Sequence, residues 1–97
     1  MAAGTATVVI TGELDAASAQ LLAVHLAWTA GAGARHVVFD MAGVSFADCA
    51  TMRLITGAAR LLPGGRRPAV RQPGPVVRRV LALTGLGSHC DVIDAGR

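Results

Sequence analysis

Four consecutive residues hold most of the side-chain chemistry that this sequence groups together. Asp48, Cys49, Ala50 and Thr51 place a carboxylate, a thiol and a hydroxyl within one helical turn. Aspartate is a preferred N-cap, because its carboxylate accepts hydrogen bonds from the first backbone N–H groups of a helix. A thiol directly after the cap lies at the positive end of the helix dipole, which favours the thiolate, whereas the Asp48 charge opposes it. The segment predicts a helix start with two candidate modification positions, Cys49 and Thr51.

The other reactive side chains show no spacing typical of a catalytic or metal site. Cys49 and Cys90 form no C-x-x-C pair, and His25, His36 and His89 follow no ligand pattern. No paired carboxylates, nucleophile–base pair or glycine-rich phosphate loop stands out. We therefore expect no metal, no cofactor and no enzymatic activity. Because Cys49 opens a predicted helix and Cys90 a predicted strand, we also expect the two thiols to lie too far apart for a disulfide.

Strand-like and helix-like segments alternate, which predicts one α/β domain over the 97 residues. Strands are expected over residues 5–11, 36–40, 66–71 and 90–93, and helices over residues 16–30, 49–62 and 75–84. We expect residues 12–15 to turn the chain and residues 41–46 to form a loop. Because Pro68 lacks an N–H group for the ladder, we expect the third strand to lie at an edge or to be kinked.

The first predicted helix has two apolar stripes, and only one of them can face a sheet. One stripe holds Ala19, Leu22, Leu26 and Ala30, and the other holds Leu14, Ala17, Leu21, Val24 and Trp28. The stripes lie about 140° apart at 100° per residue. We expect one of them to be covered by a neighbouring element or exposed for a partner, including a second copy in a weak homodimer.

Charge and hydropathy limit the partners of the chain. The net charge is +3, and all nine basic residues are arginine; residues 1–62 have a net charge of −1 and residues 63–97 a net charge of +4. A basic end can meet an acidic partner or a phosphate. With Trp28, Phe39 and Phe46 as the aromatic residues, base stacking is unsupported, so no specific nucleic acid is expected. No apolar run of about 18 residues and no basic leader are present, which predicts a cytoplasmic protein without a membrane span.

Three motifs of the sequence occur in a recognisable order. Gly12-Glu13-Leu14-Asp15 followed by Ser18-Ala19 resembles the GELD-x-x-(S/T)-A opening of the STAS domain family. HVVFDMAGVSFAD at residues 36–48 resembles its VVLDLSGVxFxD stretch, and RRVLALTGL at residues 78–86 resembles its late helix RRVLELTGL. Each motif alone is weak, but the three together cover most of the chain with near-family spacing. The chain is identified as similar to bacterial anti-sigma-factor antagonists.

The resemblance implies a central β-sheet of about four strands with helices packed on it, and a protein-binding role. Antagonists of this family dock on an anti-sigma factor that is also a serine kinase, which frees a sigma factor and regulates transcription by partner switching. Phosphorylation of the antagonist breaks the complex. Family members often have a further strand before the first one expected here and a helix after the last, so we expect this single domain to lack both.

The family places its phosphoacceptor serine in the pattern D-S-S-G-L, where this chain has Asp48-Cys49-Ala50-Thr51-Met52. Cys49 takes the place of the acceptor serine, and Thr51 takes the place of the glycine. The docking surface implied by the resemblance consists of Asp15, Ser45, Phe46, Ala47, Asp48, Cys49, Ala50 and Thr51.

Three readings of the function stay open. The chain is an antagonist that docks on a kinase-type anti-sigma factor; or it is a nonphosphorylatable STAS scaffold or ligand- or redox-sensing module; or it is a small basic nucleic-acid-binding protein. In the redox reading Cys49 is a reactive thiol, whereas in the simpler reading it is a small residue that fills the space of the serine. Contacts with nucleic acid would be nonspecific phosphate contacts that weaken with salt.

Overall fold

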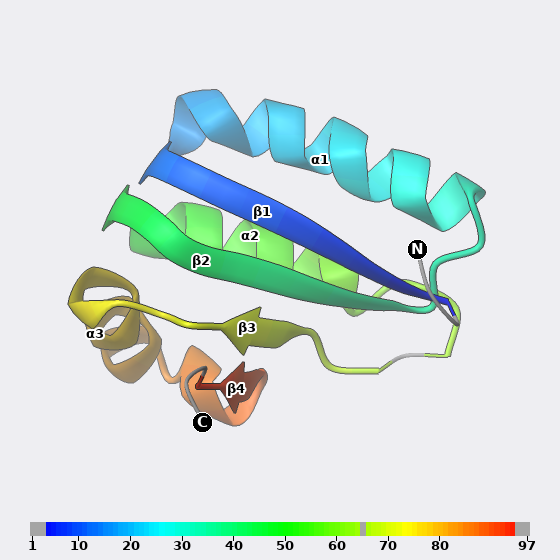
Figure 1. The fold of residues 1–97 in the computed structure, drawn as a ribbon. Helices are drawn as coiled ribbons and strands as arrows, with labels where there is room; N and C mark the ends of the chain where they lie inside the picture. The colour runs from blue at the N-terminus through cyan, green and yellow to red at the C-terminus, as the bar shows by residue number, and fades with distance from the viewer. Residues whose placement is uncertain (1–3, 65, 95–97) are drawn as a thin grey trace.

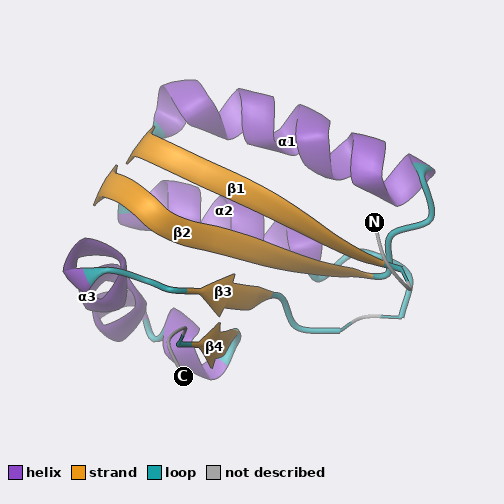
Figure 2. Cartoon of the chain, in the orientation of Figure 1, coloured by secondary structure: helices purple, strands orange, loops and turns teal. Residues whose placement is uncertain are grey.

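Strands and helices alternate along the chain, as the sequence predicts (Figures 1 and 2). The structure is a computed structural model that describes residues 4–64 and 66–94. Its elements are β1 (Thr5–Leu14), α1 (Ala16–Gly31), β2 (His36–Ala47), α2 (Cys49–Ala59), β3 (Ala69–Arg71), α3 (Pro75–Thr84), the 3-10 turn η1 (Leu86–Ser88) and β4 (Asp91–Ile93). The predicted α/β class and the predicted helix starts at residues 16, 49 and 75 are confirmed.

The four described strands form one parallel sheet in the order β1-β2-β3-β4. A helix or a helical turn connects each strand to the next, which is the connection that parallel strands require. The pairing of β1 with β2 is the longest in the sheet, and it runs from Thr5 opposite His36 to Leu14 opposite Ala47. The two strands therefore start and end together.

The core lies on the face of the sheet that the helices cover. Along β1, the side chains of Ala6, Val8 and Ile10 are buried, whereas the alternate residues Thr7 and Val9 are exposed. The helices α1 and α2 contact each other, and α3 packs on β2; α2 lies behind β1 and β2 in Figure 1. The large side chains with almost no exposure are Leu14, Val37, Phe39, Met41, Met52, Ile55, Val70 and Val77.

Two segments that we expected outside the sheet belong to its longest strands. Residues 12–14 extend β1 instead of turning the chain, and residues 41–46 continue β2 instead of forming a loop. The β1–β2 register shifts between Val9 and Thr11 and again between Gly12 and Glu13. These irregularities break the period-2 alternation of apolar residues that identifies a strand in a sequence. Gly12 has a φ of +81°, a backbone conformation that most residues with a side chain disfavour.

The other two corrections concern the second helix and the third strand. The helix expected over residues 49–62 ends at Ala59, and Leu61 and Leu62 lie in the turn that follows. The edge position expected for the third strand is wrong, because β3 lies between β2 and β4. Pro68 is compatible with this position because it precedes the strand and contributes only its carbonyl, which accepts a hydrogen bond from the Asp91 N–H at 2.9 Å.

Gly43 leaves no room for a larger residue between the two long strands. A Cβ atom at this position would lie 2.9 Å from Cγ2 of Thr11, its partner across the β1–β2 pair. We expect Gly43→Ala to lower the free energy of unfolding by about 1 kcal/mol or more, because a β-branched side chain cannot easily rotate away. Chemical denaturation measures this effect. Thr11→Ser removes Cγ2, so Gly43→Ala should cost clearly less in a Thr11→Ser background; an equal cost in both backgrounds would contradict the contact.

Candidate functional site

Two aspartates leave the sheet side by side at the carboxyl ends of β1 and β2. Leu14 and Ala47 are the last paired residues of these strands, so Asp15 and Asp48 follow at the same edge. The Asp48 N–H donates a hydrogen bond to the Leu14 carbonyl at 3.0 Å. The first turns of α1 and α2 consequently start next to each other.

Both aspartates cap the helices that follow them, and the predicted N-cap at Asp48 is confirmed. The Asp48 carboxylate accepts a hydrogen bond from the Thr51 N–H at 2.7 Å. The Asp15 carboxylate accepts one from the Ser18 N–H at 3.1 Å, and the Ser18 hydroxyl oxygen accepts one from the Asp15 N–H at 2.9 Å. This reciprocal pair is a capping box. The two carboxylates therefore fix the positions of the helix starts.

The eight residues implied as a docking surface differ in their exposure. Ser45, Phe46 and Ala50 are exposed, Asp15, Asp48 and Cys49 are half-buried, and Ala47 and Thr51 are buried. Phe46 is the large apolar side chain of this group, and 48% of its surface is exposed. Thr51 is 3% exposed, so a kinase cannot reach its hydroxyl without local opening of the helix. The accessible part of the turn is therefore formed by Ser45, Phe46 and Ala50, together with the exposed parts of Asp15, Asp48 and Cys49.

Cys49 is the first residue of α2 and packs against the edge of the hydrophobic core. Its half-buried position suits a small side chain and leaves part of the residue at the surface. Cys90 is buried, and the two thiols are free, as the sequence predicts. Burial and, to a smaller extent, the adjacent Asp91 carboxylate raise the pKa of the Cys90 thiol, which keeps it protonated and unreactive.

The turn formed by residues 45–51 at the start of α2 is called the docking turn below. A groove between α1 and α2 adjoins it, and the sequence did not predict this groove. Its volume is about 470 Å³, and it is lined by Ala16, Ala19, Gln20 and Ala23 of α1 and by Ala50, Thr51 and Leu54 of α2. Leu54 is 56% exposed. The recurrence of alanine at positions 16, 19 and 23 was the available signal, because these positions share one helix face and their small side chains leave space.

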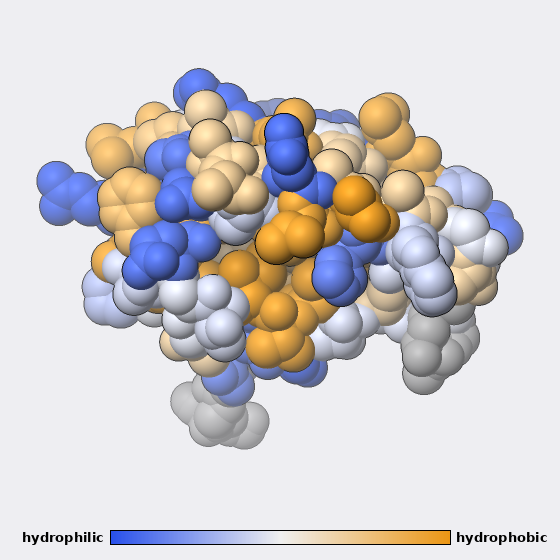
Figure 3. Space-filling model, turned by 90° about the horizontal axis from the view of Figure 1, so that it is seen from above, coloured by the Kyte–Doolittle hydropathy of each residue, from blue (hydrophilic) through white to orange (hydrophobic). Residues whose placement is uncertain are grey.

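The second apolar stripe of α1 is exposed, whereas the first is largely buried. Ala19, Leu22 and Leu26 belong to the core, and Leu21, Val24 and Trp28 are 67%, 60% and 78% exposed. Figure 3 views the molecule from the α1 side and shows apolar side chains at the surface among polar ones. Only one stripe faces the sheet, as the sequence predicts, and the other is the exposed one. Ala17 is exposed with it, whereas Leu14 is a buried residue of β1.

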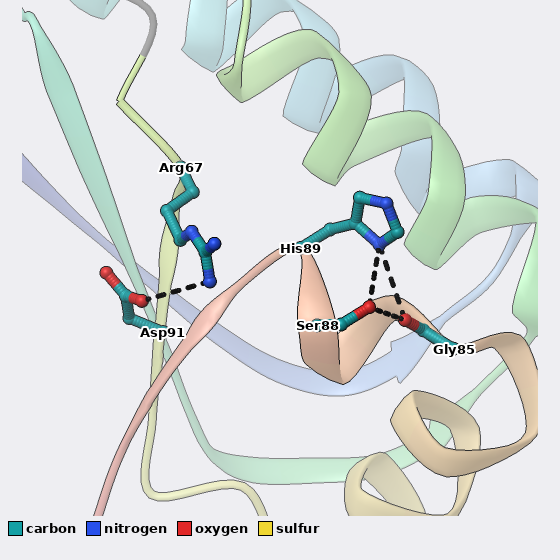
Figure 4. Close-up of polar contacts among 5 residues, drawn as sticks. All are labelled: Arg67, Gly85, Ser88, His89 and Asp91. Atoms are coloured by element: carbon teal, nitrogen blue, oxygen red, sulfur yellow. Dashed lines mark hydrogen bonds and ion pairs between the residues drawn. The ribbon is translucent and has the colours of Figure 1, made fainter.

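Three arginines of the basic C-terminal part each form an ion pair with an aspartate. Arg67 pairs with Asp91 (Figure 4), with a nitrogen–oxygen distance of 3.6 Å, and Arg71 pairs with Asp40 at 3.2 Å. Arg78 pairs with Asp94. Three arginines of this part are thus neutralised locally, and this arrangement gives no support to a nucleic-acid-binding face.

Two kinds of site are not found in the part of the chain that the structure describes. No three histidine, cysteine or acidic side chains gather there at a distance suited to a metal ion. None of the described helices has the length and apolar character needed to cross a membrane.

Comparisons with solved structures find the same fold in anti-sigma factor antagonists. The anti-sigma factor antagonist SpoIIAA in its unphosphorylated form has a TM-score of 0.79 and 22% identity, with 100% of this chain and 85% of that chain covered. An anti-sigma factor antagonist from Mycobacterium paratuberculosis has a TM-score of 0.81 and 22% identity, with 96% and 80% covered. The Bacillus cell fate determinant SpoIIAA in its phosphorylated form has a TM-score of 0.72 and 21% identity, with 100% and 88% covered.

The chain forms a small α/β domain with a parallel sheet and helices packed on it. Two capped helices start at the carboxyl ends of β1 and β2, where the turn is exposed. The family model of the STAS domain matches residues 2–94. The chain therefore belongs to the STAS domain family. A search of curated proteins finds no match.

The geometry of the turn depends on the Asp48 carboxylate, and this dependence can be measured. We expect Asp48→Ala to lower the free energy of unfolding by about 1 kcal/mol, the usual cost of losing an N-cap. Asp48→Asn retains an acceptor oxygen and should unfold close to wild type in a chemical denaturation series. If Asp48→Ala and Asp48→Asn have the same stability, the hydrogen bond to the Thr51 N–H does not hold the helix start.

Proposed function

We propose that this chain is an antagonist-type binding module that docks on an anti-sigma factor of the serine-kinase type. This role belongs to partner switching, which regulates transcription, and it places the protein in the bacterial cytoplasm. Membership of the STAS family and the likeness to anti-sigma factor antagonists support the proposal. The observation that carries it is the turn at the start of α2, where a capped helix, an exposed phenylalanine and a cysteine meet.

The docking surface consists of the accessible part of this turn and the groove beside it. The first turn of a helix leaves backbone N–H groups unpaired and carries a partial positive charge, which favours polar or acidic groups of a partner. Phe46 supplies exposed apolar area on one side of the turn, and the alanine-lined groove accepts an apolar side chain on the other. A partner segment with an acidic residue next to an apolar one fits both features.

The identity of residue 49 determines how this docking is controlled. A phosphate at the first helical position would add about −1.5 to −2 charges next to the Asp48 carboxylate and would disturb the complex by repulsion. Cys49 offers a thiol where the family has the acceptor hydroxyl. We infer that the complex of this chain is not released by the kinase, so docking is constitutive or is gated in another way.

The first prediction of this proposal concerns phosphate transfer. Incubation with a cognate kinase and ATP should leave the wild-type chain unmodified, whereas Cys49→Ser should become phosphorylated, as intact-mass spectrometry shows. Cys49→Ala serves as the control and should stay unmodified. Stoichiometric phosphorylation of the wild type at a residue other than Thr51 would show that the acceptor position is elsewhere.

The second prediction concerns affinity. Cys49→Glu places a negative charge in the first turn beside Asp48, and we expect it to weaken binding to the anti-sigma factor about tenfold or more, which equals about 1.4 kcal/mol. Cys49→Ala keeps the size small and should bind as the wild type does. Titration calorimetry measures both.

The exposed stripe on α1 is the rival docking surface, and one matched variant separates the two. Trp28→Ala removes the most exposed large side chain of that stripe and should leave the affinity unchanged. Normal binding of Cys49→Glu together with weak binding of Trp28→Ala would place the interface on α1 and would contradict the proposal.

A further inference from the structure

A basic hollow lies between α2 and η1, away from the docking turn. Its volume is about 260 Å³. On one side it is lined by Arg53, Thr56 and Gly57 of α2 and by Arg60, which follows α2; on the other side it is lined by Leu86 of η1 and by His89, which follows η1. No aspartate or glutamate is among these residues. The hollow is smaller than the roughly 300–1,000 Å³ of pockets for drug-sized ligands, so it suits a small ion or a single charged group.

The two arginines of the hollow are not neutralised by a carboxylate. Arg53 and Arg60 form no ion pair with the described residues, and neither do Arg35, Arg66 and Arg79, whereas Arg67, Arg71 and Arg78 each pair with an aspartate. Arg53 lies on α2 and Arg60 is the residue directly after it, seven positions further on, which places both on the same side of the helix. An anion in the hollow would therefore lie beside two positive charges and no negative side chain of the lining.

The His89 side chain lines the same hollow. Its Nδ1 lies 3.3 Å from the Gly85 carbonyl oxygen and 3.3 Å from the Ser88 hydroxyl oxygen (Figure 4). A carbonyl oxygen only accepts, and the Ser88 hydroxyl itself donates to the Gly85 carbonyl at 2.9 Å, so Nδ1 carries the hydrogen. Nε2 then has no partner in the described part of the chain, and the ring lies on the side of η1 that faces α2.

Gly57 keeps the hollow open at the surface of α2. Glycine in the middle of a helix destabilises it relative to alanine, so its presence needs a reason. Gly57 has no positive φ, and a Cβ atom placed on it would meet no atom within 4 Å. Neither backbone conformation nor packing requires glycine here. Its effect is to let a ligand approach the helix backbone between Arg53 and Arg60.

We propose that this hollow binds a small ligand through a phosphate group. Guanidinium groups match phosphate oxygens with two parallel hydrogen bonds, and Arg53 and Arg60 approach the ligand from both sides of Gly57. His89 supplies Nε2 as a third contact, which accepts a hydrogen bond from a phosphate oxygen that carries a hydrogen. The C-terminal end of α2 carries a partial negative charge of about one half, which two full positive charges outweigh. The proposal does not depend on the docking proposal, because it uses the opposite end of α2.

Titration calorimetry of the whole chain with inorganic phosphate and with pyrophosphate tests the proposal. We expect saturable binding of one ion per chain. The ion that fills the hollow better should have the lower dissociation constant. Arg53→Gln and Arg60→Gln should each weaken it about tenfold. Arg79→Gln removes the same charge from the exposed face of α3 and should bind as the wild type does. Absence of saturable binding, or equal weakening by Arg79→Gln, would overturn the proposal.

A second variant tests the position of the ligand without removing a charge. Gly57→Gln directs a side chain into the hollow and replaces glycine with a good helix former. We expect an unchanged or higher melting temperature together with loss of phosphate binding. Wild-type phosphate binding by Gly57→Gln, or a clearly lower melting temperature, would contradict the open hollow that the geometry assigns.

Discussion

The pairing of β1 with β2 ends at Leu14 and Ala47, so two aspartates leave the sheet at the same place. The Asp48 N–H is bonded to the Leu14 carbonyl, and each aspartate then caps its own helix. The positions of α1 and α2 follow from these two caps, and so does the alanine-lined groove between them. A slip of this register by one residue would move Asp48 away from the Leu14 carbonyl and would turn the apolar side chains of β1 to the opposite face. The turn and the groove would be lost together.

The helix α2 connects the two regions to which we assign binding. Its N-terminal end has the positive end of the dipole, the Asp48 cap and Cys49, and its C-terminal end has Arg60 and the hollow at Gly57. Its buried face, with Met52 and Ile55, is anchored in the core and allows little independent movement of either end.

Local signals predicted the elements whose ends are marked by specific residues. Asp48 identified the start of α2, and Pro75 and Gly85 identified both ends of α3, because capping and ring geometry act within a few residues. The limits of β1 and β2 could not be predicted, because the bulges near Thr11 and Gly12 exist only in the pairing of two distant segments. The same reason hid the groove and the basic hollow. Each of them combines residues of two elements, such as Ala19 with Leu54 or Arg53 with His89, and no single segment contains the pattern.

The account rests on the claim that the turn at the start of α2 is the surface that meets a partner. Hydrogen exchange measured by mass spectrometry, with and without a serine-kinase anti-sigma factor from the same genome, tests this claim directly. We expect slower exchange in the peptides that cover Ser45 to Leu54 and the first two turns of α1, and unchanged exchange around Trp28. Slower exchange confined to the exposed stripe of α1, or no change in any peptide under saturating partner, would contradict the account.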